Sequence, residues 1–280
     1  MRGFLAVVIW LCGGISLFAD KVETYEVESP YQSGKQRIQV LLPDDYPSGK
    51  PYRVLYVLPV GKSVTNQTAI SGGLKLFQQM NAHNEYHLIM VDPGFEKTPW
   101  FGDHATDATT RQAGYMKEFV VPFIESHYST CGGPEGRLLF GFSKSGWGAF
   151  SLILKYPEYF GYAAAWDSPM MLTDFHFGMD EVFGTLDRLE KYRPDLLAVQ
   201  QKQFFQSRTR LVLTGEKLWG TMIPAPDGGS HTVDMHNLLV KEGVLHVYDN
   251  TVASEHRWMP DWMAPTLRML MELVEKDAAN

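Results

Sequence analysis

Cysteine and charge are both scarce in this 280-residue chain. Its two cysteines are Cys12 and Cys131. Cys12 lies in a segment that we expect to be removed, so the mature chain has no cysteine pair for an intrachain disulfide. Charged residues make up 20% of the chain, with 25 Lys and Arg against 32 Asp and Glu. This acidic balance offers no basic surface for nucleic acid, and we expect no nucleic-acid partner.

Long apolar runs, repeats and linkers are also scarce. The one long uncharged run, residues 4–18, follows Arg2 and is too short to cross a membrane comfortably. It ends at Ala19 before the polar Asp20, as a secretory signal peptide does. We therefore expect a signal peptide over residues 1–19 and an exported protein, periplasmic or secreted, without membrane attachment after cleavage. Residues 20–280 contain no repeat or linker, which predicts a single domain.

Short apolar runs alternate with helical spacing of apolar residues along the rest of the chain. The runs have the length of strands, and several are apolar throughout, as strands covered on both faces are. This alternation predicts an α/β fold with a mainly parallel central sheet and helices on both faces. The predicted strands are 37–42, 53–58, 87–91, 137–140, 162–166, 210–213 and 244–248, and the predicted helices are 115–127, 144–156, 231–242 and 260–276.

Two segments interrupt this alternation. Residues 43–49, rich in Pro, Asp and Gly, are typical of a hairpin-like turn between two early antiparallel strands. Residues 168–207, rich in Met, Phe and Tyr, are longer than one helical connection needs. We interpret them as an inserted helical cap.

Ser143 is the candidate nucleophile. It lies between a predicted strand and a helix that begins with small residues, in Gly141-Phe142-Ser143-Lys144-Ser145-Gly146. A serine at such a strand-to-helix turn takes a strained backbone conformation that exposes its Oγ, and small neighbours let strand and helix pass closely. The sequence departs from G-x-S-x-G at Ser145, which is still small.

His256 is the candidate general base. A serine hydroxyl needs a base, usually histidine, to become nucleophilic at neutral pH. In α/β-hydrolases the chain order is Ser, acid, His, with the histidine in the loop after the last strand. His256 lies in the loop that follows the last predicted strand, whereas seven of the other eight histidines precede Ser143 or lie in predicted helices and strands.

Four carboxylates are candidates for the acid that orients His256. Asp167 follows the strand after the nucleophile helix, one of two places where this fold carries the acid. The other place is the loop after the next strand, which offers Glu216 and Asp227, with Asp234 one turn into the following helix. The sequence leaves the choice among these four open.

Acyl transfer also needs donors for the developing oxyanion. We expect the backbone N–H of Lys144 to be one donor. The second should come from the loop after strand 53–58, where Val60 and Gly61 are the candidates.

Aromatic residues flank the predicted carboxyl ends of the strands, where open α/β sheets bind ligands. They predict a pocket for an apolar or aromatic acyl group. No motif indicates a metal or an organic cofactor, and we expect none. The candidate pocket residues are Trp100, Phe142, Trp147, Trp166 and Trp258.

With these residues assigned, the chain resembles the putative esterase family of α/β-hydrolases, which includes S-formylglutathione hydrolases, feruloyl and acetyl-xylan esterases, enterochelin esterases and mycolyltransferases. The resemblance runs from about residue 36 to 270 and rests on residues 40–46 with 52–58, 117–128, 141–148 and 256–258. Three positions depart from the family pattern. Pro59-Val60 replaces His-Gly, Lys144-Ser145 replaces the common Met-Gly, and no aspartate follows Gly215 where the usual acid falls.

The resemblance and the residues together predict an exported serine hydrolase. We expect a carboxylic ester hydrolase that uses a Ser-His-Asp/Glu triad and an acyl-enzyme on a small-molecule or carbohydrate-linked ester. Two alternatives stay open at this point: a noncatalytic binding protein of the same fold, and an acyltransferase.

Overall fold

A computed structural model describes residues 22–62, 72–215, 223–226 and 228–279. The predicted signal peptide, residues 1–19, lies outside these ranges, and so do Glu216 and Asp227. Among the described residues, no helix combines the length and the apolar character that crossing a membrane requires.

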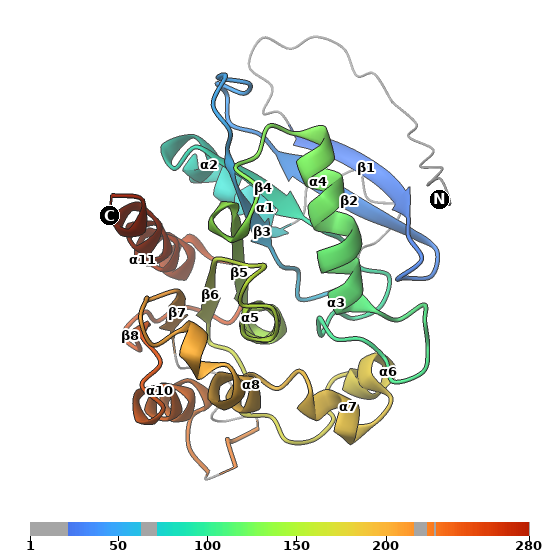
Figure 1. The fold of residues 1–280 in the computed structure, drawn as a ribbon, viewed down its shortest axis with the longest axis vertical. Coiled ribbons are helices and arrows are strands. Elements are labelled where there is room, and N and C mark those ends of the chain that lie inside the picture. Colours follow the sequence, from blue (N-terminus) through green and yellow to red (C-terminus); the bar gives the residue numbers. More distant parts are fainter. Residues whose placement is uncertain (1–21, 63–71, 216–222, 227, 280) are drawn as a thin grey trace.

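One eight-stranded sheet forms the centre of the structure, in the order β1-β2-β4-β3-β5-β6-β7-β8 (Figure 1). The strands β4, β3, β5, β6, β7 and β8 are parallel, whereas β2 is antiparallel to both β1 and β4. The bounds are β1 Val22–Glu28, β2 Lys35–Leu41, β3 Arg53–Val57, β4 Leu88–Asp92, β5 Arg137–Phe142, β6 Tyr162–Trp166, β7 Leu211–Thr214 and β8 His246–Asp249.

The mainly parallel sheet confirms the predicted fold class, and each of the seven predicted runs overlaps an observed strand. The strand β1 was not predicted. It lies at the sheet edge, where its apolar residues Val22, Tyr25 and Val27 are only partly buried and Thr24, Glu26 and Glu28 are exposed. Such an edge strand lacks the continuous apolar run that marks the central strands.

The predicted hairpin at residues 43–49 is wrong. The strands that it connects, β2 and β3, are not neighbours, because β4 lies between them and pairs with both. A turn pattern in the sequence shows that the chain reverses direction. It does not show whether the two flanking strands pair with each other or with a third strand.

Helices cover both faces of the sheet and enclose two hydrophobic cores (Figure 1). Alternate residues of each central strand point into opposite cores: Leu138 and Phe140 into one, and Leu139 into the other. The helices α1 Gly72–Gln79, α2 Ala82–Glu85 and α11 Pro260–Ala278 cover the first face. The second face is covered by α3 Gln112–Gly114, the π-helix Tyr115–Val120, α4 Val121–His127, α5 Ser143–Lys155 and α10 His231–Lys241.

The predicted cap segment, residues 168–207, contains several short helices between β6 and β7. They are α6 Met179–Phe183, α7 Leu186–Glu190, α8 Pro194–Gln200 and a 3-10 turn Lys202–Phe204. The helix α8 packs on α5, and the ring of Phe183 on α6 meets Trp147 on α5 edge to face, with centroids 5.9 Å apart. The helical content matches the expectation, while the role as a cap stays a prediction.

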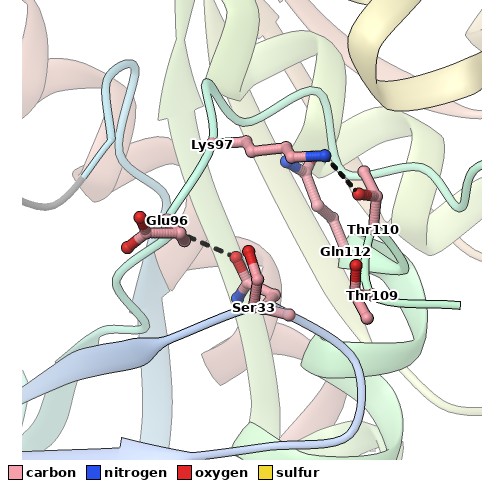
Figure 2. A pocket seen from close by; sticks show the side chains of 7 residues that line it. Ser33, Glu96, Lys97, Thr109, Thr110 and Gln112 are labelled. Carbon is pink, nitrogen blue, oxygen red and sulfur yellow. Dashed lines mark hydrogen bonds between the residues drawn. The ribbon is translucent and has the colours of Figure 1, made fainter. Parts of the chain in front are cut away.

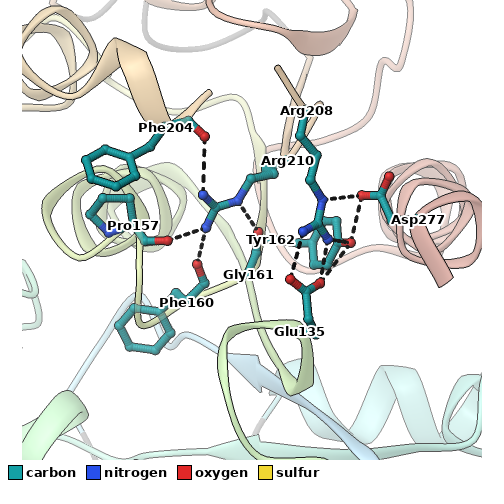
Figure 3. A network of polar contacts seen from close by, with 9 residues as sticks. All are labelled: Glu135, Pro157, Phe160, Gly161, Tyr162, Phe204, Arg208, Arg210 and Asp277. Carbon is teal, nitrogen blue, oxygen red and sulfur yellow. Dashed lines mark hydrogen bonds and ion pairs between the residues drawn. The ribbon is translucent and has the colours of Figure 1, made fainter. Parts of the chain in front are cut away.

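Two arginines hold the amino ends of β6 and β7 (Figure 3). The buried guanidinium of Arg210 donates to the backbone oxygens of Pro157, Phe160, Gly161 and Phe204. The more exposed Arg208 donates to Asp277 on α11, to Glu135 in the 3-10 turn Pro134–Gly136 and to the hydroxyl of Tyr162. These contacts tie together segments at the opposite end of the sheet from Ser143.

Candidate active site

The backbone at Ser143 has the strained geometry expected of a nucleophile at a strand-to-helix turn. Phe142 ends β5 in an extended conformation, and Ser143 begins α5 with φ of +53°. A non-glycine residue rarely takes a positive φ, and such strain persists only where the surrounding structure holds it. A side chain at Gly141 would place its Cβ 2.4 Å from the backbone carbon of Ser145, so glycine is required there.

Ser145 makes a contact that the glycine of G-x-S-x-G could not make. Its hydroxyl accepts a hydrogen bond from the backbone N–H of Phe142 at 3.1 Å and donates to the backbone oxygen of Phe142 at 2.9 Å. The backbone N–H and carbonyl oxygen of Phe142 are both buried, and the hydroxyl of Ser145 gives each of them a hydrogen-bond partner in place of water. The departure from the motif therefore secures the turn that carries Ser143.

Asp167 occupies the equivalent place at the end of the neighbouring strand. Phe142 on β5 and Trp166 on β6 are register partners, so Ser143 and Asp167 are the next residues on two adjacent parallel strands. Both have a positive φ, which is +42° at Asp167. The backbone N–H of Asp167 donates to the oxygen of Thr214 on β7 at 2.9 Å, and the residue is 2% exposed.

His256 reaches Asp167 from the loop after β8. Its Nδ1 lies 2.8 Å from Oδ2 of Asp167. Because an ionised carboxylate only accepts, the neutral imidazole carries its proton on Nδ1 and not on Nε2. This tautomer is the one a general base needs.

Aromatic rings hold the imidazole of His256 beside the serine turn. Phe142, the residue before Ser143, meets the imidazole edge to face with centroids 5.3 Å apart, and Trp166 lies 5.9 Å from it. The indole N–H of Trp166 donates to the backbone oxygen of Val252 at 2.8 Å, which ties the loop of His256 to β6. Ser143 and Asp167 thus directly follow β5 and β6, and His256 lies in the loop after β8. All three lie beyond the carboxyl ends of parallel strands.

The remaining acid candidates have different positions. Asp234 lies in the first turn of α10, beside Gly229. Glu216 and Asp227 are outside the described residues. Among the residues that the structure describes, Asp167 is the candidate acid whose carboxylate contacts His256.

The candidate oxyanion donors belong to segments that follow two neighbouring strands. Lys144 is in the first turn of α5, and Val60 and Gly61 follow β3, which is the neighbour of β5. Leu58 N–H donates to the oxygen of Phe140 at 2.9 Å, so the pairing continues toward this loop. Their role in binding an oxyanion stays a prediction.

The candidate pocket aromatics differ in exposure. Trp100, Trp147 and Trp166 are fully buried and pack inside the protein, so they present no surface to a ligand in this arrangement. Trp258 is partly exposed and packs on Phe142, with centroids 4.8 Å apart. A role in substrate binding stays a prediction for all five residues, and burial favours a packing role for the three tryptophans.

His231 holds the segment that follows Asp167, a role that sequence reasoning missed. Its Nδ1 accepts from the backbone N–H of Met171 at 3.0 Å, and its Nε2 therefore donates to the oxygen of Ile223 at 2.8 Å. Burial lowers the pKa of His231, which favours this neutral form. No local sequence signal separates such a histidine from a surface one.

Within the described part of the chain, no group of three His, Cys, Asp or Glu side chains is placed to hold a metal ion.

Known proteins share this architecture. The profile of the putative esterase family matches residues 29–269. Two curated esterases of Mycobacterium tuberculosis, MT1326 and Rv1288, are 28% identical over 138 residues, which are 48% of this chain and 29% of each relative. The chain therefore matches less than a third of the length of these relatives.

Solved structures match nearly the whole chain. An S-formylglutathione hydrolase from Agrobacterium tumefaciens has a TM-score of 0.71 at 14% identity, covering 95% of this chain and 99% of that one. The fluorophosphonate-binding serine hydrolase F of Staphylococcus aureus has a TM-score of 0.69 at 18% identity, covering 91% and 98%. A ferulic acid esterase from Anaeromyces mucronatus, solved with ferulic acid, has a TM-score of 0.54 at 17% identity, covering 95% and 93%. These likenesses establish the α/β-hydrolase fold.

Proposed function

The chain belongs to the putative esterase family, and from this premise we propose that it is a serine esterase with Ser143 as nucleophile, His256 as general base and Asp167 as the acid. The observation that carries this proposal is the contact between His256 and Asp167 beside the strained turn of Ser143. That arrangement supports His256 as a base with its proton on Nδ1, near a strained serine at a strand-to-helix turn.

Acylation begins with proton transfer from Ser143 Oγ to His256 Nε2. The serine oxygen attacks the ester carbonyl, and the carbonyl oxygen takes up the negative charge. The imidazolium that forms is stabilised by the ionised Asp167, which stays ionised. When the tetrahedral intermediate collapses, the alcohol leaves with the proton of Nε2, and the acyl group stays on Ser143.

Deacylation repeats these steps with water. His256 Nε2 takes a proton from the water as its oxygen attacks the acyl carbonyl, and then returns that proton to Ser143 Oγ as the acid is released. The backbone N–H of Lys144, with that of Val60 or Gly61, binds the oxyanion in both halves. Removal of one such donor costs about 3 kcal/mol of transition-state stabilisation in enzymes of this kind.

The proposed substrate is a small-molecule or carbohydrate-linked carboxylic ester, and the proposed location is outside the cytoplasm. The apolar start of the chain favours export, because residues 1–19 have the pattern of a signal peptide. Ferulic acid is bound in the solved Anaeromyces mucronatus relative, which supports esters of organic acids as the first substrates to assay.

Labelling with a fluorophosphonate probe, followed by peptide mapping, tests the proposal. We expect modification of Ser143 in the wild type and its loss in Ser143→Ala and His256→Ala. Ser151→Ala is the matched control, because it removes a buried hydroxyl from the same helix α5 outside the proposed triad.

A folded protein that neither labels nor hydrolyses short acyl esters would overturn the proposal and favour a noncatalytic binding protein. Hydrolysis and acyl transfer are separated by adding an alcohol acceptor to the assay. Formation of a new ester faster than the free acid would identify an acyltransferase instead.

A further inference from the structure

The side chain of Lys144 lies half-buried beside the proposed nucleophile. Lys144 directly follows Ser143, so their Cα atoms are about 3.8 Å apart. Its Nζ lies 5.8 Å from the ring centroid of Trp100, within the range of a cation–π contact. The ammonium therefore lies within the length of one lysine side chain from the backbone that directly follows Ser143.

Trp100 is a fixed support for this ammonium. Its indole N–H donates to the backbone oxygen of Phe177 at 3.1 Å, and its backbone N–H donates to Oε1 of Gln112 at 2.8 Å. Figure 2 shows Gln112 in the adjoining polar cluster, where Nζ of Lys97 donates to Thr110 at 2.6 Å. The ring also meets Trp147 edge to face at 5.6 Å. Nζ of Lys144 accordingly lies against an indole ring that its hydrogen bonds and ring contacts hold in place.

No carboxylate compensates this charge within the described residues, where Nζ of Lys144 has neither an ion pair nor a hydrogen bond. Burial lowers the pKa of Lys144. Other shielded cations are paired: Arg137 bonds to Glu125 at 2.7 Å, and Lys155, on the same helix as Lys144, donates to the oxygen of Lys191 at 2.9 Å.

An unpaired, half-buried ammonium is unfavourable, and the position of Lys144 makes it more so. Removing a charge from water without a partner costs free energy. The amino end of α5 adds positive potential, which also disfavours a cation and favours an anion. The ammonium and the helix end together would attract a negatively charged group.

We propose that Lys144 binds a carboxylate that the substrate carries close to its scissile ester bond. This inference rests on the proposed function, because it places the charged end of the substrate beside the acylated Ser143. The carboxylate belongs to either the acyl part or the alcohol part of the ester, and the experiment separates these two sources.

Two pairs of esters measure the preference for an anion. The acyl pair is p-nitrophenyl hemiglutarate and p-nitrophenyl valerate, and the alcohol pair is 4-carboxyphenyl butyrate and phenyl butyrate. The readout is the ratio of kcat/KM for the charged ester to that for the neutral ester. It is compared in wild type, Lys144→Met, Lys144→Arg and the matched control Lys155→Met, which removes a shielded ammonium from the far end of α5.

We expect Lys144→Met to lower this ratio about tenfold for one of the two pairs, the size of a charge-assisted hydrogen bond. Lys144→Arg should keep most of the preference, and Lys155→Met should not alter it. Added salt should lower the ratio in wild type more than in Lys144→Met, because a charge interaction is screened. An unchanged ratio in Lys144→Met for both pairs, or an equal fall in Lys155→Met, would overturn the inference.

A second readout does not need turnover. Monomethyl glutarate should protect Ser143 from fluorophosphonate labelling better than dimethyl glutarate in wild type, and this difference should disappear in Lys144→Met. If wild type labels at Ser143 but both compounds protect it equally, the inference fails while the proposed function stands. If folded wild type neither labels nor hydrolyses any ester, the proposed function itself fails.

Discussion

Nδ1 of His256 lies 2.8 Å from Oδ2 of Asp167, although 89 residues separate them in the chain. Asp167 is almost fully buried, whereas the side chain of His256 is 17% exposed. A buried carboxylate thus fixes the orientation of a partly exposed imidazole. Four predictions follow from this contact and from the framework around it.

Replacement of Asp167 by Asn should lower kcat for a short acyl ester by about 10³- to 10⁴-fold, the effect of such a change in a known catalytic triad. The amide can donate to Nδ1 of His256, which moves the ring proton to Nε2 and removes the base. Steady-state kinetics of Asp167→Asn measures this loss.

Glu216→Gln and Asp227→Asn are the controls, because both acids are rival candidates. We expect each to keep kcat within a few-fold of wild type. If one of them loses as much activity as Asp167→Asn, the acid assignment is wrong.

Replacement of Ser145 by Ala should lower the free energy of unfolding by about 1–3 kcal/mol, because a buried N–H and a buried oxygen of Phe142 lose their partner. Urea denaturation measures the change. Ser151→Ala serves as the control, since the hydroxyl of Ser151 has no hydrogen-bond partner among the described residues and its loss should cost less. Equal destabilisation by the two variants would contradict the role given to Ser145.

The two arginines at the amino ends of β6 and β7 should contribute differently to the free energy of unfolding. Arg210→Met leaves four backbone oxygens without their donor, and we expect a loss of about 3 kcal/mol or more in the free energy of unfolding. Arg208→Met removes more exposed ion pairs and should cost about 1 kcal/mol. Thermal and urea denaturation test the order, and a larger loss in Arg208→Met would contradict it.

His231 should make the stability of the protein depend on pH. Burial lowers its pKa in the folded state below the ordinary value of about 6.5, so the unfolded chain binds more protons as the pH falls. The contribution of His231 to stability is therefore complete above pH ~6.5 and is lost as the pH falls toward the folded pKa. Urea denaturation from pH 7.5 to 5 should show a smaller decline in His231→Gln than in wild type.

His246→Gln is the comparison for this pH series, because burial also lowers the pKa of His246. A double variant should show less decline than either single one. If His231→Gln declines as steeply as wild type, proton binding at His231 does not contribute.

The central strands, the main helices and the position of Ser143 were all readable from the sequence. Buried parallel strands require continuous apolar runs, and a tight strand-to-helix turn requires small residues, so these features leave local patterns. The edge strand β1 and the neighbours of β2 were not readable. An edge strand carries a weaker pattern, and strand order depends on contacts between residues far apart in the chain.

The sequence by itself determined the fold class, the membership of the esterase family and the serine turn, because each depends on residue types at short spacing. Only the tertiary structure brought Asp167 to His256, showed that Ser145 holds the turn, and placed the ammonium of Lys144 against the ring of Trp100. The physical reason is that a hydrogen bond or a charge contact depends on distance in space. Folding sets that distance by placing the carboxyl ends of the parallel strands β5, β6 and β8 at the same end of the sheet.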